Sequence, residues 1–479
     1  MLAVHGGGGL DHIVTSFGDE LAPIDESKFV QIWVFEPGNG AEARFGHSEV
    51  VEWMTARLDR SRVFTEIVEF RSPLAYPVWR TADHVEVADH IRCTDLDGVG
   101  WDGFTAEWAR IVAAPMDVSR PLWELHAITG VRGVPGIPDD AVYLVIKFQH
   151  AIGDGVEAVA ISRRLFDAPD ADVEKPEPDY APPGPLRQVA AIPGQVVNML
   201  RAARRTRTAV AELDELTASG QIPPAPTAVP NRFNAPASGG AVVVDVMRRS
   251  LVAAQVARRG VAGATVNDFA LAVVSGAMRE YLRHHGELGS DPVVVAAPMS
   301  LIPLSERREN PEQASNQFGM ILVDLHVQEV DPRVRLEKVA ESTAHGKRRS
   351  RSAPAMIATT GLDDYPWWMA RKVVAATHRA VEAGTGISAN AMVTNVPRGP
   401  SDLTFLGRPS ITAFNASPVH AGFAVSVASL GAELAFSFVG TAEMMPDPQH
   451  FRRALEDSFD ALVAALDQAE PDRPTIPVG

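Results

Sequence analysis

Apolar runs and segments of helical spacing follow one another along the chain, which is the pattern of a mixed α/β protein. Residues 29–35 (Phe-Val-Gln-Ile-Trp-Val-Phe) are aromatic and β-branched and predict a buried strand that ends before Pro37-Gly38. Residues 141–149 (Ala-Val-Tyr-Leu-Val-Ile-Lys-Phe-Gln) are apolar enough to predict a strand inside a sheet. Other elements predicted in this half are helices at 48–58, 104–112 and up to residue 166, and a strand at 121–127.

Two loosely built segments interrupt this pattern. Residues 167–186 are acidic and rich in proline, which disfavours both helices and sheets, and residues 220–240 are rich in Pro, Ala and Gly. A helix is predicted between them, over about 195–216. We therefore predict an N-terminal domain at 1–170, a linker with one helix at 171–240 and a C-terminal domain at 241–479.

The C-terminal domain begins with a strand and a helix whose start is well marked. Thr265 is a suitable N-cap, and Asp268 follows it at the spacing of a capping box. Asn267 and Asp268 lie in the first turn of this helix, so they serve either as capping residues or near an active site. The remaining predicted elements are strands at 293–297, 318–325, 391–396, 411–413, 424–427 and 433–438, and helices at 333–345, 366–379 and 450–466.

Charge and cysteine content exclude several classes of function. The 60 acidic residues outnumber the 44 basic ones and give a formal charge of −16, so the surface repels nucleic acid and we expect no nucleic-acid partner. Cys93 is the only cysteine, which rules out an intrachain disulfide and fits a reducing, cytoplasmic location. Since no apolar run reaches about 18 residues, contact with a membrane or a lipid droplet would have to be peripheral.

The turn after the central strand carries the strongest chemical signal. Its sequence, Gln149-His150-Ala-Ile-Gly-Asp154-Gly155, lies between a strand and a helix. A histidine held there is well placed to accept a proton from a hydroxyl and to return it later, because an imidazole is partly neutral at cellular pH. We expect a structural role for Asp154 at the start of the helix, and we expect Gly155 to allow backbone or ligand to come close.

The pattern His-x-x-x-Asp-Gly after an apolar strand resembles the CoA-dependent acyltransferase superfamily of chloramphenicol acetyltransferase and the peptide-synthetase condensation domains. Within it, the chain resembles the bacterial wax ester synthase/diacylglycerol acyltransferase family over almost its whole length. Besides the histidine turn, four segments carry the resemblance: Pro23-Ile24-Asp25-Glu26-Ser27-Lys28-Phe29, Pro121-Leu122-Trp123-Glu124, Thr265-Val266-Asn267-Asp268 and Thr394-Asn395-Val396-Pro397.

The resemblance implies two chloramphenicol-acetyltransferase-like α/β sandwich domains with a tunnel at their interface. It implies an acyl-CoA-dependent O-acyltransferase in which His150 is the general base, with acyl-CoA as co-substrate, no cofactor and no metal. The acceptor would be diacylglycerol, in triacylglycerol synthesis, or a long-chain alcohol, in wax ester synthesis. Two alternatives stay open: a weakly active or inactive homologue that binds lipid or acyl-CoA, and an acyltransferase for small or polyketide-like hydroxyl compounds.

One position departs from the superfamily pattern, in which two histidines stand side by side. The first is Gln149 here, and we expect its amide to replace the hydrogen bonds of the missing imidazole on the face opposite His150. We expect Pro121, Leu122 and Trp123 to support the adjacent strand by packing.

Three further groups of residues are weaker candidates. His284-His285 ends a helix and is not predicted to bind metal, because no carboxylate or cysteine stands at ligand spacing in the sequence. Arg201, Arg204, Arg205 and Arg207 would lie on a helix that rests on anionic lipid or faces solvent. Lys347-Arg348-Arg349-Ser350-Arg351 would contact the phosphates of CoA or form a solvated loop. The sequence does not identify the residues that bind acyl-CoA.

Overall fold

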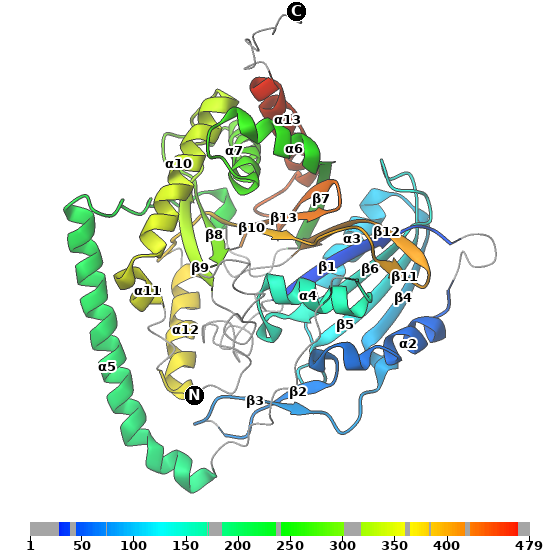
Figure 1. The fold of residues 1–479 in the computed structure, drawn as a ribbon, viewed down its shortest axis with the longest axis horizontal. Helices are drawn as coiled ribbons and strands as arrows, with labels where there is room; N and C mark the ends of the chain where they lie inside the picture. The colour runs from blue at the N-terminus through cyan, green and yellow to red at the C-terminus, as the bar shows by residue number, and fades with distance from the viewer. Residues whose placement is uncertain are drawn as a thin grey trace, which may run out of the picture.

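A computed structural model describes residues 28–38, 45–72, 74–169, 171, 184–235, 241–300, 318–359, 365–382, 385–416 and 422–467. Most of the acidic, proline-rich stretch at 167–186 and most of the Pro23–Phe29 motif lie outside these residues. The described chain contains two six-stranded sheets, with helices packed around them (Figure 1). The mixed α/β class predicted from the sequence is confirmed.

The first sheet carries the predicted histidine turn at its centre. Its strand order is β11-β12-β1-β6-β5-β4, and β1 and β6 are antiparallel, with Lys28 opposite Gln149. The strands are β1 (Lys28–Phe35), β4 (Ile91–Val99), β5 (Trp123–Val131), β6 (Val142–Gln149), β11 (Thr404–Phe405) and β12 (Arg408–Ala416). All eight residues of β1 and all eight of β6 are buried, as their mostly apolar sequences predict for central strands.

Helices and a small hairpin complete the first half. The helices are α2 (His47–Thr55), α3 (Trp101–Ala113) and α4 (Gly155–Leu165), and the short 3-10 turns are η2 (Leu58–Arg60), η3 (Arg62–Phe64), η4 (Val87–His90) and η5 (His150–Ile152). The hairpin of β2 (Glu66–Glu69) and β3 (Val78–Thr81) was not predicted. Its strands have only four residues each, which is too short for a clear alternation of polar and apolar positions.

The second sheet has the order β7-β14-β13-β10-β8-β9 and belongs to the second half of the chain. Its strands are β7 (Val242–Ser250), β8 (Val294–Ser300), β9 (Phe318–Asp324), β10 (Ala391–Pro397), β13 (Ala424–Leu430) and β14 (Glu433–Thr441). Near it lie α6 (Leu251–Ala257), α7 (Val266–His284), α10 (Pro332–Ser350) and α13 (Pro448–Asp467), with the turns η6 (Arg232–Asn234) and η7 (Arg258–Gly260). Helices α6, α7, α10 and α13 gather at one end of the molecule (Figure 1).

The two halves share a sheet, because β12 leaves the second half and pairs with β1. Trp33 lies opposite Ala413, and the pairing runs antiparallel from Val30 to Phe35 with one irregularity near the end of β1. Only residues 411–413 were predicted as a strand here, whereas β12 covers Arg408–Ala416. The rest of β12 carries no signal in the sequence, because pairing with β1 of the other half, and not an alternation of polar and apolar residues, makes these residues a strand.

Helix α5 (Pro185–Ala218) is the longest element and runs along one side of the molecule beside α11 (Ala353–Thr359), with α12 (Trp367–Glu382) nearby (Figure 1). It begins ten residues earlier than the predicted helix at 195–216 and continues through Pro193. Among the described residues, no helix is both long and apolar enough to cross a membrane.

Candidate active site

His150 lies at the end of β6, in the short turn η5, and is partly exposed. Its ring packs on the ring of Phe29 from β1, with 4.0 Å between the ring centres and an angle of 32° between the planes. Phe29 is opposite Phe148 in the β1–β6 pair. Two buried central strands therefore hold both the backbone of His150 and the aromatic surface against which its imidazole lies.

Gln149, which replaces the first histidine of the superfamily pattern, stabilises the turn η5 through a buried side chain. Its side chain is buried, and its Oε1 accepts a hydrogen bond from the backbone N–H of Ala151 at 2.7 Å. Its own backbone N–H donates to the carbonyl oxygen of Leu122 at 3.2 Å. Because the amide caps η5 directly, the turn that presents His150 does not depend on a second imidazole at this position.

Asp154 is the N-cap of α4. One carboxylate oxygen accepts the backbone N–H groups of Val156, at 3.0 Å, and of Glu157, at 2.9 Å. The residue before it, Gly153, has a φ of 152°, a value that L-residues rarely adopt. The short sequence from His150 to Asp154 thus combines a 3-10 turn, a glycine and a capped helix start, which fixes the direction in which the chain leaves the histidine.

Gly155, the first residue of α4, is approached by a side chain from the second half. A Cβ atom built on Gly155 would lie 3.1 Å from Cγ2 of Val396 and 3.9 Å from Cε1 of Phe29. Val396 belongs to β10 and to the Thr394-Asn395-Val396-Pro397 segment singled out in the sequence. The sequence predicts that backbone or ligand comes close to Gly155, and the structure shows instead a side chain from the other half of the protein, at a residue that follows the histidine by five positions.

Two residues after Val396, the chain contains a buried arginine that was not identified as important from the sequence. Arg398 follows β10 and donates to the side-chain oxygen of Gln31 at 2.8 Å, to the carbonyl oxygen of Phe414 at 3.3 Å and to the side-chain oxygen of Asn415 at 3.2 Å. Its guanidinium also lies 4.7 Å from the ring centre of Trp33. Burial lowers the pKa of Arg398 to about 9, so the group keeps its proton at neutral pH.

Gln31 links this arginine to the helix that follows the histidine turn. Its single side-chain oxygen accepts Arg398, Trp33 Nε1 at 3.2 Å and the hydroxyl of Ser162 in α4 at 3.0 Å. Arg163 of α4 in turn donates to the carbonyl oxygen of Arg398 at 3.0 Å. Strand β1, helix α4 and the end of β10 are therefore joined by a continuous buried network.

The Pro121-Leu122-Trp123 segment leads into β5, which pairs with β6 from Trp123 opposite Phe148. Leu122 and Trp123 are almost fully buried, and Trp123 Nε1 donates to the carbonyl oxygen of Phe64 at 3.2 Å. His90 stacks on the indole at 4.2 Å and bonds through Nδ1 to the carbonyl oxygen of Trp123 at 2.8 Å. Burial lowers the pKa of His90 despite this hydrogen bond. The segment braces β6 next to the histidine turn, since Leu122 also accepts the N–H of Gln149.

Asp268 acts as a capping residue at the start of α7. Its Oδ2 accepts the backbone N–H of Thr265 at 2.8 Å and the Thr265 hydroxyl at 2.7 Å, and the Thr265 hydroxyl accepts the N–H of Asp268 at 3.2 Å. This is a complete capping box. Asn267 is partly buried in the same turn. Asn267 and Asp268 are predicted either to cap the helix or to lie near an active site, and the contacts of Asp268 are those of a capping residue.

The basic segment 347–351 is not the solvated loop considered above. Residues 347–350 form the last turn of α10, and Arg351 is its C-cap, so their positive charges suit the negative end of the helix dipole. Arg349 donates to the hydroxyl of Thr217 at 2.9 Å and to the carbonyl oxygen of Pro223 at 3.2 Å. Arg349 therefore joins the end of α10 to the end of α5.

Comparison with known proteins gives the family. A family model of the wax ester synthase/diacylglycerol acyltransferase catalytic domain matches residues 27–270, and a model of the C-terminal domain of the same family matches residues 314–463. A putative diacylglycerol O-acyltransferase of Mycobacterium tuberculosis is 26% identical over 442 residues, which cover 85% of this chain and 81% of that protein.

Solved structures agree on the fold. A wax ester synthase/diacylglycerol acyltransferase from Marinobacter aquaeolei VT8 superposes with a TM-score of 0.63 at 19% identity, covering 95% of this chain and 98% of that one. The starter condensation domain of rhizomide synthetase, solved with C8-CoA and Leu-SNAC, superposes with a TM-score of 0.54 at 14% identity and covers 99% and 97% of the two chains. With both domain models matched in order along the sequence, the chain belongs to the wax ester synthase/diacylglycerol acyltransferase family.

Proposed function

We propose that His150 is the general base of this acyl-CoA-dependent acyltransferase and that the acceptor is the hydroxyl of diacylglycerol or of a long-chain alcohol. Family membership establishes the class of enzyme. The observation that carries the role of His150 is its position: a partly exposed histidine at the end of a buried strand, five residues before Gly155, which Val396 of the other half approaches.

The proposed chemistry needs one proton carrier and no covalent enzyme intermediate. The neutral imidazole takes the proton of the acceptor hydroxyl while its oxygen attacks the carbonyl carbon of the thioester. A tetrahedral oxyanion forms and collapses, which breaks the carbon–sulfur bond. The departing CoA thiolate then receives the proton from the imidazolium, so the products are an ester and free CoA, and the histidine returns to its starting state.

Support for an acyl-CoA donor comes from the family and from a distant protein of the same fold that was solved with C8-CoA. The oxyanion needs hydrogen-bond donors, and the backbone N–H groups near the start of α4 are candidates because helix starts favour negative charge. Asp154 already accepts two of those N–H groups, from Val156 and Glu157, so the donors would have to be others.

A transfer assay with radiolabelled acyl-CoA tests the base. We expect His150→Ala to lower turnover by about 10²–10⁴-fold, the usual contribution of a general base. His345→Ala on α10 is the matched control, because it removes an exposed imidazole that pairs with Glu341 at 3.9 Å on the same helix. Both variants should retain the circular dichroism and urea midpoint of the wild type. Equal turnover of wild type and His150→Ala, above the background without enzyme, would overturn the proposal in favour of a non-catalytic lipid-binding role.

Competition between acceptors tests the substrate class. With one acyl-CoA, hexadecanol, diacylglycerol and a small polar alcohol are offered together and the labelled esters are separated. We expect the two lipid acceptors to account for most of the product. Preference for the small alcohol would instead favour the alternative in which the enzyme acylates small hydroxyl compounds.

We also propose that α5 brings the enzyme to a lipid surface, where such acceptors reside. Leu186, Val189, Val197 and Leu200 are exposed and recur at helical spacing, so they fall on one side of α5, while Ala202, Ala209 and Leu213 on the other side are buried. The arginines at 201, 204, 205 and 207 follow this apolar stretch. Exposed apolar side chains beside basic ones favour peripheral binding to anionic lipid.

Vesicle sedimentation tests this contact. The wild type should sediment with vesicles that contain an anionic phospholipid, and a Val197→Ser/Leu200→Ser double variant should sediment less. The expected control is Val252→Ser/Val256→Ser, which removes two exposed valines from α6 in the second half. Equal loss of binding in both double variants would show that α5 has no special role.

A further inference from the structure

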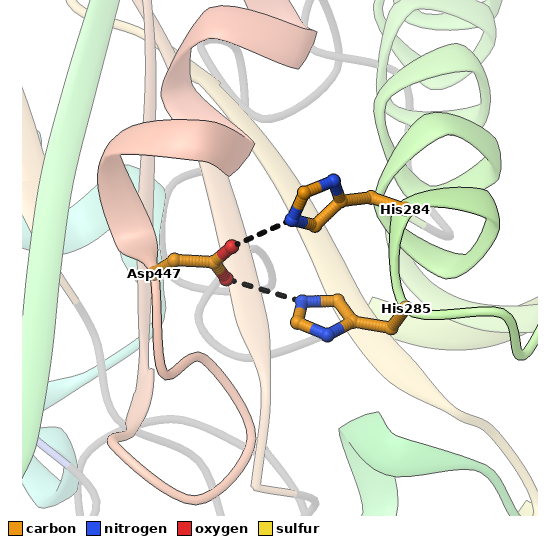
Figure 2. Close-up of side chains that lie close together, drawn as sticks. All are labelled: His284, His285 and Asp447. Carbon is orange, nitrogen blue, oxygen red and sulfur yellow. Dashed lines mark hydrogen bonds and ion pairs between the residues drawn. The ribbon is translucent and has the colours of Figure 1, made fainter.

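Two adjacent histidines at the end of α7 meet a carboxylate from a distant part of the chain (Figure 2). His284 is the last residue of α7, His285 is its C-cap, and Asp447 directly precedes α13. The sequence argued against metal binding here because no carboxylate stood at ligand spacing. The fold removes that objection, since it brings Asp447 next to the histidines across more than 160 residues of sequence.

The donor atoms converge as a metal site requires. Nε2 of His284 is 3.3 Å from one oxygen of Asp447, and Nε2 of His285 is 3.2 Å from the other. One ligand atom from each of the three residues lies within 4.8 Å of the others. Tetrahedral ligands at about 2.0–2.1 Å from Zn²⁺ stand about 3.3 Å apart, and each of the two nitrogen–oxygen separations, which run to different oxygens of Asp447, is close to that value.

Neighbouring side chains hold these ligands in place. The hydroxyl of Tyr281, one turn back on α7, donates a hydrogen bond to the carboxylate of Asp447. The ring of His450, from the first turn of α13, stacks on His284 with 4.0 Å between centres. Metal sites commonly have such outer partners, which orient the ligating carboxylate and imidazole.

The local charge favours a cation. The C-terminal end of the 19-residue helix α7 carries a partial negative charge, to which the carboxylate of Asp447 adds a full one. Arg283, the arginine next in sequence to the histidines, is paired with Glu280 at 2.7 Å. Arg232, whose guanidinium lies 5.3 Å from the Tyr281 ring centre, is paired with Glu287, also at 2.7 Å. Their positive charges are therefore largely compensated.

We propose that His284, His285 and Asp447 form a binding site for a divalent first-row transition ion such as Zn²⁺, on the second half of the protein and separate from the His150 turn. Two imidazoles and one carboxylate suit the nitrogen and oxygen preference of such ions, and solvent supplies the remaining ligands because His284 is exposed. A bound ion would tie the end of α7 to the start of α13. It would stabilise the second half without taking part in acyl transfer.

Calorimetric titration of the full chain with Zn²⁺, after removal of any histidine tag, tests the site. We expect one equivalent to bind and the melting temperature to rise with Zn²⁺ concentration. Asp447→Asn and His285→Ala should each weaken binding by at least about tenfold, by analogy with the loss of supporting groups around known metal sites. His345→Ala, which removes an exposed histidine elsewhere, should bind as the wild type does. Co²⁺ should give a visible absorption band that Asp447→Asn loses.

A second variant keeps the test decisive if Asp447→Asn fails to fold. His284 is exposed at a helix end, so His284→Ala should leave the fold intact, as checked by circular dichroism, and should still lose affinity. Absence of saturable binding to the wild type would overturn the proposal. Equal Zn²⁺ affinity in the wild type, His284→Ala and His285→Ala would do so as well.

Discussion

Replacement of Gly155 by alanine tests whether contact between the two halves positions the histidine turn. The new Cβ would lie 3.1 Å from Val396 Cγ2. Because carbon atoms pack best at about 3.5–4.0 Å, the valine or the start of α4 must move by roughly half an ångström. Such overpacking costs about 1–3 kcal/mol, and alanine offsets up to about 1 kcal/mol of it through its higher helix propensity. The free energy of unfolding should therefore fall by between about 0 and about 3 kcal/mol.

Acyl transfer should fall as well, because the displaced residues lie close to the histidine turn. A displacement of about 1 Å near reacting groups can cost 10²-fold in rate, so half of that predicts a loss of about tenfold in kcat. The acyl-transfer assay is run on Gly155→Ala, Val396→Ala and the double variant, with urea unfolding of each. Since Val396→Ala frees the space, the double variant should regain most of the turnover. A fully active Gly155→Ala, or a double variant no better than Gly155→Ala, would refute the reasoning; the latter would mean that a ligand, not Val396, needs the room.

Three further outcomes follow from buried contacts. Gln31→Leu removes the acceptor of Arg398 and of an indole N–H, and should lower the free energy of unfolding by about 1–3 kcal/mol for each group, measured in urea. Thr265→Ala should cost about 0.5–2 kcal/mol through the lost cap but leave kcat unchanged; a fall in kcat at full stability would place this turn at the active site. Burial lowers the pKa of His90 below its ordinary 6.5, so as the pH falls through that value the unfolded chain binds a proton that the folded chain does not. The free energy of unfolding should therefore decrease as the pH is lowered below about 6.5. The urea midpoint of His90→Gln should decrease less over the same pH range, and an equal decrease in both proteins would contradict this assignment.

Local sequence patterns were sufficient wherever one segment carries its own signal. The buried strand at 141–149, the capped helix after Thr265 and the helix start at Asp154 all appear as predicted, to within a few residues. A continuous apolar run predicts burial on both faces of a strand, and a capping residue satisfies helix N–H groups that lie within three residues of it. The start of α5 was placed too late, since the helix begins at Pro185 and continues through Pro193.

Contacts between distant segments were beyond reach of the sequence. Arg398 looks like an ordinary loop arginine in the sequence, yet it is 3% exposed and joins β1 to β12. Part of the reason is that β12, although it lies in the second half of the sequence, is a strand of the first sheet and pairs with β1. One sequence without relatives gives no signal for such pairings, which depend on which surfaces meet when both halves pack.

The sequence alone determined the α/β class, the strand–turn–helix unit that carries His150 and, through its motifs, the family, because each of these depends on residues within a few positions of one another. Only the tertiary structure decided that Gly155 is approached by Val396, that Gln149 caps the turn of His150, and that Asp447 joins His284 and His285. The physical reason is the distance along the sequence over which each interaction acts. Caps and apolar periodicity act over one or two turns of chain, whereas contacts across hundreds of residues exist only once burial of the two sheets has brought those segments together.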